Sequence, residues 1–589
     1  MENYTIGADS YSQPAETAVG TTIEAPGTVT AIYKNAKGRA FDVTVDGFQF
    51  ENFSNEPPRV FKDDLASDDI FALFGPTACT SGTTAATCVL SGPARKWMLA
   101  QIADMGFGHC EGMAATSLRL FDERPFKGKA KPADFQSGAA STSNLNFPAQ
   151  VLENYISYYF ITQTVDEYYD AQIVAGPVEI VNRLTADFNK ANPVPYTMGI
   201  YKMPGFKAGH AITAYGVEKV NAGESRILIY DNNYPKQRQY ITVNMNANTW
   251  RYVTAAVPGQ TPDVYTGTAT SGNLSIQPNN ARDLPAGEYF TCPFCPTSGA
   301  QAADAGQTDA TISFQYSGEG ALLVTNSDDQ STGFAFDVEE DINEIPGAEL
   351  IYFNGGLGYD VPPRIVVPVV ETDGAFNSVF ISGKGIDDVA EGALSITGEG
   401  YVVGLDAIQL DPDEFLEIAV SQDGTEIAFR ATETIEAPSM YISYDPVSAE
   451  DPSIIFQISG IILDADEESS LVLDPDLERV YFDDTSGGGG QEVDVTMTFI
   501  WPDGDEENYV ETIDVPDGSS SAFIDFGAWD GLLDPSIYVD DLLQNPSVNH
   551  RLKLVNSTGT YDPTPQTDAP AGVYHVEATF TNVTEVVLG

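Results

Sequence analysis

The sequence has few positive charges. Its 589 residues include 28 Lys and Arg against 86 Asp and Glu, which gives a formal net charge of -58. Residues 1–300 hold 22 of the cations and 29 of the acids, so residues 301–589 hold only 6 cations against 57 acids. A surface of this charge repels nucleic acid and anionic membrane, which excludes nucleic-acid binding. A salt-adapted protein would be acidic throughout, so the acidity belongs to the C-terminal half.

Long apolar runs are also absent. No stretch reaches the 20 or so apolar residues that a transmembrane helix needs, so we expect no transmembrane segment. The first residues, Met1–Ile6, lack the basic and apolar regions of a signal peptide. The Gly-, Thr- and Asp-rich composition of the acidic half is nevertheless typical of exported proteins. We therefore expect a secreted or cell-surface protein whose signal peptide has been removed.

Cysteine is scarce, and its spacing is informative. Cys79 and Cys88 bracket a loop of small residues, and Cys292 and Cys295 form a CxxC motif. Pairing each couple locally predicts two disulfides in an exported protein and leaves Cys110 as a thiol. The alternatives are one zinc site built from the four cysteines, a redox-active pair at Cys292 and Cys295, or five reduced thiols.

Cys110 lies where a glycine-rich turn gives way to a helical pattern. A helix N-terminus and a nearby imidazole stabilise a thiolate nucleophile. The chain has only four histidines: His109, His210, His550 and His575. His550 and His575 lie in the β-rich half, and the side chain of His109 diverges from that of its neighbour Cys110. We therefore predict Cys110 as nucleophile and His210, at the head of a strand, as base.

The acid at the end of the next strand completes a candidate triad. Asp231 follows the apolar run 226–230 and would orient His210, as an acid or amide does in nucleophilic triads. Asn232 and Asn233 are the alternative third members, because an amide also performs this role.

Three segments together resemble a divergent bacterial papain-like cysteine peptidase domain. They read Gly-His-Cys-Glu-Gly-Met at 108–113, Gly-His-Ala at 209–211 and Tyr-Asp-Asn-Asn-Tyr-Pro at 230–235. The resemblance covers residues 100–245 and implies an α+β fold with thiol acyl-transfer chemistry. The oxyanion-hole glutamine of such enzymes is absent just before Cys110, and Gln101 and Gln150 are the candidates to replace it. Glu111, next to the nucleophile, disfavours a thiolate through its charge.

The pattern of apolar residues predicts four regions. Residues 1–58 form an arm and a strand at 39–50, and residues 59–300 form the papain-like α+β domain. In the latter we expect helices at 94–105, 148–171 and 175–191, followed by strands at 196–201, 210–215, 226–230 and 239–243. Residues 301–444 and 445–589 are predicted as two all-β antiparallel sandwiches of immunoglobulin-like type, because short apolar strands alternate there with turn residues. A final strand is expected at 574–580.

Acidic turns in the C-terminal half offer oxygen ligands to calcium. Asp464, Asp466, Asp503 and Asp505 are the candidate ligands, although no complete EF-hand loop occurs. No cofactor is required by the predicted thiol chemistry.

The sequence thus predicts a secreted, multidomain papain-like cysteine peptidase or amide-transfer enzyme with acidic β-rich modules. One alternative is a non-catalytic surface or assembly protein that uses a degenerate papain-like domain, and another is a calcium-dependent adhesin. The expected partner is a peptide or protein substrate, or else other surface subunits, including further copies of the same chain.

Overall fold

The computed structural model describes residues 27–54, 65–146, 150–255, 257–296, 310–336, 340–354, 361–369, 375–432, 434–446, 451–484, 491–515, 522–527, 535–539, 542–543, 552–555 and 585–588. The strand expected at 574–580 and most of the expected N-terminal arm lie outside these residues. No helix among the described residues is long and apolar enough to cross a membrane.

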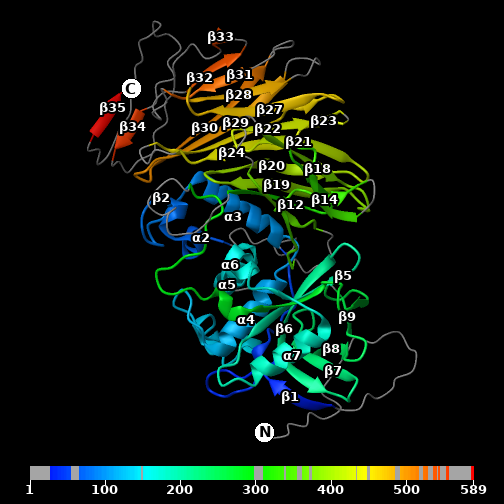
Figure 1. Ribbon diagram of the computed structural model, residues 1–589. Helices are drawn as coiled ribbons and strands as arrows, with labels where there is room; N and C mark the ends of the chain where they lie inside the picture. Colours follow the sequence, from blue (N-terminus) through cyan, green and yellow to red (C-terminus); the bar gives the residue numbers. More distant parts are fainter. Residues whose placement is uncertain are drawn as a thin grey trace.

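The helices of the described residues all lie in the N-terminal half (Figure 1). The α-helices are α1 (Val43–Asp46), α2 (Ser67–Phe74), α3 (Gly92–Met105), α4 (Cys110–Asp122), α5 (Gln150–Ile161), α6 (Asp166–Tyr169) and α7 (Pro177–Phe188). The 3-10 helices are η2 (Gly75–Ala78), η3 (Pro132–Asp134), η4 (Thr142–Asn144), η5 (Thr162–Thr164) and η6 (Asn279–Arg282).

One antiparallel sheet accompanies these helices, in the order β10-β9-β8-β7-β6-β5-β11-β4, with β1 also paired to β6. Its strands are β1 (Thr28–Ile32), β4 (Ile173–Val174), β5 (Tyr196–Lys202), β6 (Lys207–Lys219), β7 (Glu224–Tyr230), β8 (Gln239–Asn244), β9 (Thr249–Thr254), β10 (Asp263–Gly267) and β11 (Leu274–Pro278). A small hairpin joins β2 (Cys79–Ser81) to β3 (Val89–Leu90). The N-terminal half is therefore mixed α and β, as predicted.

The strand predicted at 39–50 is wrong. Residues 43–46 form the single helical turn α1 instead, because the Asp42 side chain accepts a hydrogen bond from the Thr44 N–H and caps it. Phe41, Val43 and Phe48 are all buried, so the alternating apolar pattern serves a turn that packs on the core rather than a strand. The strand of this region is β1, which lies earlier in the chain.

Residues 311–543 form two large antiparallel sheets. The first has the order β16-β17-β12-β19-β20-β24-β25-β29-β30. Its strands are β12 (Thr311–Ser317), β16 (Glu349–Ile351), β17 (Arg364–Pro368), β19 (Ala390–Gly398), β20 (Tyr401–Leu410), β24 (Ser439–Tyr444), β25 (Ser453–Ser459), β29 (Gln491–Ile500) and β30 (Glu506–Val515).

The second sheet has the order β15-β14-β13-β18-β21-β22-β27-β28-β31-β32-β33. Its strands are β13 (Ala321–Thr325), β14 (Ser331–Ala335), β15 (Glu340–Asn343), β18 (Phe376–Ser382), β21 (Phe415–Ser421), β22 (Glu426–Arg430), β27 (Glu468–Asp474), β28 (Arg479–Asp484), β31 (Ala522–Asp525), β32 (Ser536–Val539) and β33 (Leu542–Leu543). Two further pairs join β23 (Ile435–Glu436) to β26 (Ile462–Leu463) and β34 (Leu552–Val555) to β35 (Glu585–Leu588).

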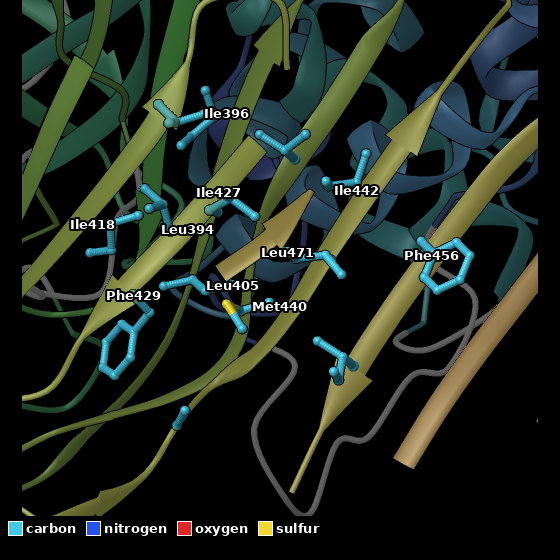
Figure 2. Close-up of a cluster of buried hydrophobic side chains, with 14 of the residues drawn as sticks. Leu394, Ile396, Leu405, Ile418, Ile427, Phe429, Met440, Ile442, Phe456 and Leu471 are labelled. Atoms are coloured by element: carbon cyan, nitrogen blue, oxygen red, sulfur yellow. The ribbon is translucent and has the colours of Figure 1, made fainter. Parts of the chain in front are cut away.

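The two large sheets share one apolar core. Alternate side chains of each strand point inward, as expected for strands with one buried face. Figure 2 shows Leu394, Leu405 and Met440 from the first sheet meeting Ile418, Phe429 and Leu471 from the second. This core runs continuously from Ile312 to Ile537. Neither sheet breaks at the expected boundary of 444 and 445, because β24 pairs with β25 in the first sheet and β22 pairs with β27 in the second.

Helix α3 joins the two halves. It lies beneath β19 and β20 in Figure 1 and contacts β12, β24 and β25 as well. The Lys96 ammonium lies 3.0 Å from Asp406 and 3.8 Å from the centre of the Tyr441 ring, and Arg95 lies 2.8 Å from Glu506. Cations of the N-terminal half thus meet acids of the C-terminal half at this contact.

Candidate active site

Cys110 is the first residue of α4, so its side chain lies at the positive end of a 13-residue helix. Helix α4 lies close against α5, since a Cβ at Gly112 would come within 2.1 Å of the Ile156 carbonyl oxygen. The other side of α4 contacts β6, where the Ala211 N–H donates to Cys110 Sγ over 3.3 Å. Both contacts fix the thiol at the junction of helix and sheet.

The sheet brings His210 and Asp231 together. Strands β6 and β7 are antiparallel neighbours with Thr213 paired to Tyr230. The end of β7 that carries Asp231 therefore returns beside the start of β6 that carries His210. The His210 Nε2 atom lies 2.9 Å from Asp231 Oδ1. The predicted histidine and acid are thus adjacent, although 21 residues separate them in the chain.

The Asp231 carboxylate is buried and fully hydrogen-bonded. It accepts from Tyr252 Oη at 2.7 Å, from Thr254 Oγ1 at 2.9 Å and from the Asn233 N–H at 2.8 Å. Burial alone would raise the pKa of Asp231, but the charge of His210 and these hydrogen bonds hold it below its usual value. Asp231 is therefore an anion that orients the His210 imidazole and favours its protonated form.

The pKa of His210 is raised to about 10. Burial alone would lower it, but the charge of Asp231, its hydrogen bond and the adjacent Cys110 thiol outweigh burial. Because Asp231 engages Nε2, the Nδ1 atom is the one that remains for the Cys110 thiol, whose interaction with the imidazole also raises the His210 pKa. The imidazole is thus ready to hold a proton taken from Cys110.

The two asparagines that were alternatives to Asp231 have other contacts. Asn232 Nδ2 donates to the carbonyl oxygens of Cys110 and Ala211, both over 3.0 Å, and so ties the start of α4 to β6. Asn233 Nδ2 donates to the Ala255 carbonyl oxygen over 2.9 Å. The His210 imidazole donates its Nε2 hydrogen bond to Asp231 and not to either asparagine.

His109 is directed away from the thiol, as expected from its neighbouring position. Its ring stacks on Phe53 with centroids 4.2 Å apart, and its Nδ1 lies 2.9 Å from the Phe53 carbonyl oxygen. The His109 N–H donates to Asn52 Oδ1 over 2.9 Å. Residues 52 and 53 therefore belong to the wall of the site, although they were expected in a separate N-terminal piece.

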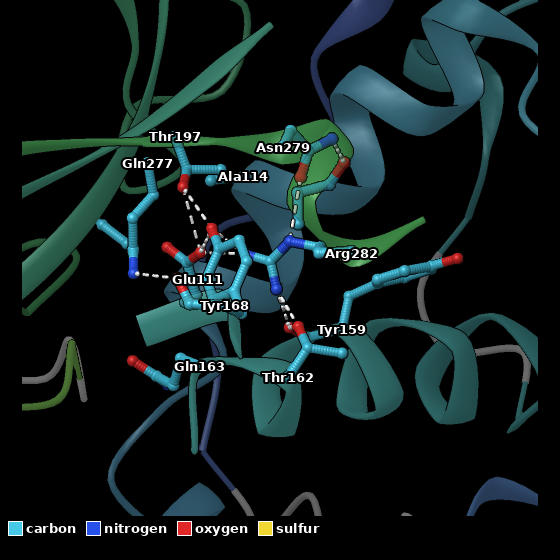
Figure 3. Close-up of polar contacts among 12 residues, drawn as sticks. Glu111, Ala114, Tyr159, Thr162, Gln163, Tyr168, Thr197, Gln277, Asn279 and Arg282 are labelled. Atoms are coloured by element: carbon cyan, nitrogen blue, oxygen red, sulfur yellow. Dashed lines mark hydrogen bonds and ion pairs between the residues drawn. The ribbon is translucent and has the colours of Figure 1, made fainter. Parts of the chain in front are cut away.

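Glu111 is neutralised within a buried network rather than left beside the thiol. Its carboxylate forms an ion pair with Arg282 and accepts from Thr197 Oγ1 at 3.0 Å and Tyr168 Oη at 3.1 Å. Figure 3 shows Arg282 between Glu111 and Thr162. The Arg282 guanidinium also lies 3.8 Å from the centre of the Tyr168 ring. This network ties α4 to η5, α6, β5 and η6, and so positions the nucleophile.

The acidic half closes the site. Cys110 Sγ donates to the Asn354 carbonyl oxygen over 3.2 Å, and the Asn354 N–H donates to Gln163 Oε1 over 2.9 Å. The side chains of Cys110, His210 and Asp231 have no exposed surface. The three candidate residues therefore lie together under a segment of the C-terminal half.

Sequence reasoning missed both Gln163 and Asn354. Gln163 is 3% exposed, and its Nε2 has no hydrogen-bond partner among the described residues. Gln163 and the thiol both contact the backbone of Asn354, so Gln163 is a further candidate for the oxyanion donor that the sequence assigned to Gln101 or Gln150. Gln101 is buried on α3, and the side chain of Gln150 lies outside the described residues. No sequence motif surrounds Gln163. The only local signals are its two threonine neighbours and its position at the end of a helical pattern.

Both predicted disulfides are present. Cys79 bonds to Cys88 and Cys292 bonds to Cys295, while Cys110 remains a buried thiol. Cysteines bonded to one another cannot ligate zinc as thiolates, so the zinc site and the five reduced thiols are excluded for this form of the chain, while redox activity of Cys292 and Cys295 stays a prediction.

The candidate calcium ligands lie in two separate turns. Asp464 accepts from Thr434 Oγ1 at 3.0 Å, and Asp466 is 87% exposed. Asp503 accepts from the Asp505 N–H at 3.0 Å. Within the described ranges, no three His, Cys, Asp or Glu side chains gather so as to hold a metal ion. Calcium binding at these turns stays a prediction.

Comparison of the chain with family models, with curated proteins and with solved structures finds no match. The chemistry of the site therefore has to be argued from its geometry.

Proposed function

We propose that this protein is a cysteine peptidase, or an amide-transfer enzyme using the same thiol, built on a papain-like domain and carrying an acidic immunoglobulin-like β-sandwich region. The observation that carries the proposal is the position of His210, which is hydrogen-bonded to Asp231 through Nε2 and lies beside Cys110. The two disulfides suit an exported protein, so we place its action outside the cell.

The reaction follows from these contacts. The Cys110 proton passes to His210 Nδ1, and the thiolate attacks a peptide carbonyl carbon. Gln163 Nε2 and the N-terminus of α4 stabilise the negative charge that develops on the carbonyl oxygen. The leaving amine takes the proton from His210, and a thioester to Cys110 remains. Water then hydrolyses the thioester, whereas a second amine in place of water gives amide transfer.

The second candidate is a non-catalytic surface or assembly protein. The complete burial of Cys110, His210 and Asp231 favours it, since a sealed triad can also serve as a structural core. Copies of the same chain or other surface subunits would then be the partners.

Alkylation of Cys110 by iodoacetamide between pH 5 and 9, followed by mass spectrometry, separates the two candidates. The shape of the pH profile carries the test, because a buried thiol reacts slowly whatever its state of ionisation. We expect wild-type Cys110 to react already at pH 6, and the rate at pH 6 to fall by about 100-fold in His210→Ala.

A neighbouring histidine supplies the control for this test. His109→Gln alters a buried imidazole that stacks on Phe53 and whose Nδ1 meets the Phe53 carbonyl oxygen, and it should keep the wild-type profile. If wild type and His210→Ala share one profile that rises only at alkaline pH, the enzyme proposal fails and the structural one stands.

A further inference from the structure

The segment that closes the site, residues 352–354, enters from the acidic half directly after β16. Asn354 is 3% exposed and uses both of its backbone groups in the N-terminal half. Its carbonyl oxygen faces Cys110 Sγ and its N–H faces Gln163 Oε1. Peptidases read extended substrates through these same main-chain groups. The thiol thus donates to the carbonyl oxygen of Asn354 instead of facing its carbonyl carbon, so the segment occupies the place of a substrate residue in an orientation that the thiol does not attack.

Two glycines of the sheet make room for this segment. A Cβ at Gly199 of β5 would come within 2.9 Å of Asn354 Oδ1, and a Cβ at Gly209 of β6 would come within 2.9 Å of the Phe353 carbonyl oxygen. Gly199 pairs with Ala211, so both positions flank His210. A side chain at either position would displace the segment. The cleft wall is thus shaped for a short planar amide at position 354.

An aromatic site lies two residues earlier. The Tyr352 ring packs on Phe206 with centroids 4.4 Å apart, and its carbonyl oxygen accepts from Tyr201 Oη at 2.9 Å. The Tyr352 hydroxyl donates to Asp341 over 2.8 Å, which is a contact within the acidic half. Apart from that last contact, Tyr352 is held by groups that would remain if the segment left.

We propose that residues 352–354 occupy the cleft as a built-in substrate analogue, so that the site selects peptides with Asn at the attacked carbonyl and an aromatic residue two positions before it. This inference rests on the proposed function and names its substrate class. The segment also excludes other peptides while it is bound. For a free peptide of this kind, Cys110 forms the thioester with the Asn carbonyl carbon, the C–N bond breaks, and the amine leaves with the proton from His210.

The test measures alkylation of Cys110 by iodoacetamide at a single pH in the full chain. Tyr352→Ala removes the ring contact with Phe206 and should speed alkylation about tenfold, because the segment is held less tightly. The matched control is Tyr538→Ala, which removes a comparable ring contact with Phe523 at 4.6 Å, within the acidic half. Its alkylation rate should stay within about twofold of wild type.

Peptide protection then tests the substrate class. In Tyr352→Ala, acetyl-Tyr-Phe-Asn-amide should slow alkylation about tenfold at saturation, whereas acetyl-Tyr-Phe-Asp-amide should not, because a buried carboxylate without a partner is disfavoured. Gly199→Ala is the second variant if Tyr352→Ala does not fold by far-UV circular dichroism. It should speed alkylation but lose protection by the Asn peptide, since its Cβ fills the amide site.

Equal alkylation rates in wild type and in the folded variants would contradict the proposal that residues 352–354 occupy the cleft. Equal protection by the Asn and Asp peptides would overturn the substrate class. Neither result depends on the pH profile of His210→Ala, so failure of this inference and failure of the proposed function are distinguishable.

Discussion

The two halves of the molecule are both built on antiparallel sheets, but they use charge in opposite ways. The N-terminal half buries four of its cations, among them Arg282, which pairs with Glu111. The acidic half has six cations in its sequence, and the buried Arg364 donates to the Thr164 carbonyl oxygen of the other half over 3.0 Å. Acids of the β half form ion pairs where α3 meets them, through Arg95 and Lys96, and also within the half, where Arg479 pairs with Asp525. In the N-terminal half, buried charge holds the residues of the candidate site in place. In the acidic half, buried charge stabilises the contact with the other half.

The largest expected effect comes from the buried ion pair. Arg282→Met leaves Glu111 charged and buried without its partner, and should lower the free energy of unfolding by about 3–5 kcal/mol. Differential scanning calorimetry should show the loss in the transition of the N-terminal half only. The double variant Glu111→Gln/Arg282→Met should recover much of the lost free energy of unfolding. An equal loss in the transition of the β half would contradict the difference between the two halves.

The second-largest effect is expected from the two disulfides, which both lie in the N-terminal half. Replacing Cys79 and Cys88 by Ser removes a bridge over a separation of nine residues and should cost about 2–3 kcal/mol. Replacing Cys292 and Cys295, only three residues apart, should cost less. Chemical denaturation monitored by circular dichroism measures both. No loss in the first variant would show that the hairpin β2–β3 is not part of the cooperative unit.

The contact between the halves is tested through Lys96. Lys96→Met removes an ammonium that is 7% exposed and lies against Asp406 and the Tyr441 ring, and should destabilise by about 2 kcal/mol. The control is Lys37→Met, whose side chain is 68% exposed, with an expected loss below about 0.5 kcal/mol. Thermal melting at low and high salt measures both, and similar values would mean that the contact is not electrostatic.

Asp104 makes the same contact sensitive to pH. Burial raises its pKa to about 7, although a hydrogen bond from Ser317 and the charge of Arg364 act to lower it. Because the folded pKa lies above the unfolded one, a protonated Asp104 favours the folded state. This contribution to the free energy of unfolding is present at low pH and is lost as pH rises through 7. We expect the free energy of unfolding to fall by about 1 kcal/mol between pH 6 and 8. Asp104→Asn should flatten this part of the curve, and an unchanged slope would contradict the assignment.

The smallest effect is expected from chelation. Two carboxylates per turn are too few for tight calcium binding, so EGTA should lower the unfolding temperature by at most about 1 °C. A magnesium-containing buffer without calcium is the control. A larger drop confined to the acidic half would favour the calcium-dependent adhesin.

Cys110, His210 and Asp231 could be selected from the sequence because their chemistry restricts the choice, and the structure brings them together. Pairing four of the five cysteines left Cys110, and only His210 among four histidines stood in a β-strand of the same half. The closing residues could not be predicted in this way. Asn354 contacts a thiol 244 residues away, and Gln163 contacts Asn354 across 191 residues. Neither contact leaves a local pattern, because both depend on how the halves pack.

The strands were easier to predict than their partners. Short apolar runs between turn residues predicted that the acidic half is all-β and antiparallel, which the structure has. Local patterns do not specify which strands pair, so the sequence did not predict that β24 pairs with β25 across the expected domain boundary. At 39–50 the alternation of apolar residues was equally compatible with the capped turn that the chain adopts.

The origin of Asn354 in the later half also has a consequence for biosynthesis. A ribosome adds residues from the N-terminus, so Cys110, His210 and Asp231 emerge before the residue that covers them. At about 5–20 residues per second, the 244 residues from Cys110 to Asn354 take roughly 12–50 s. During that interval a nascent chain would display its thiol uncovered, and the order of synthesis would set how long the cleft stays open.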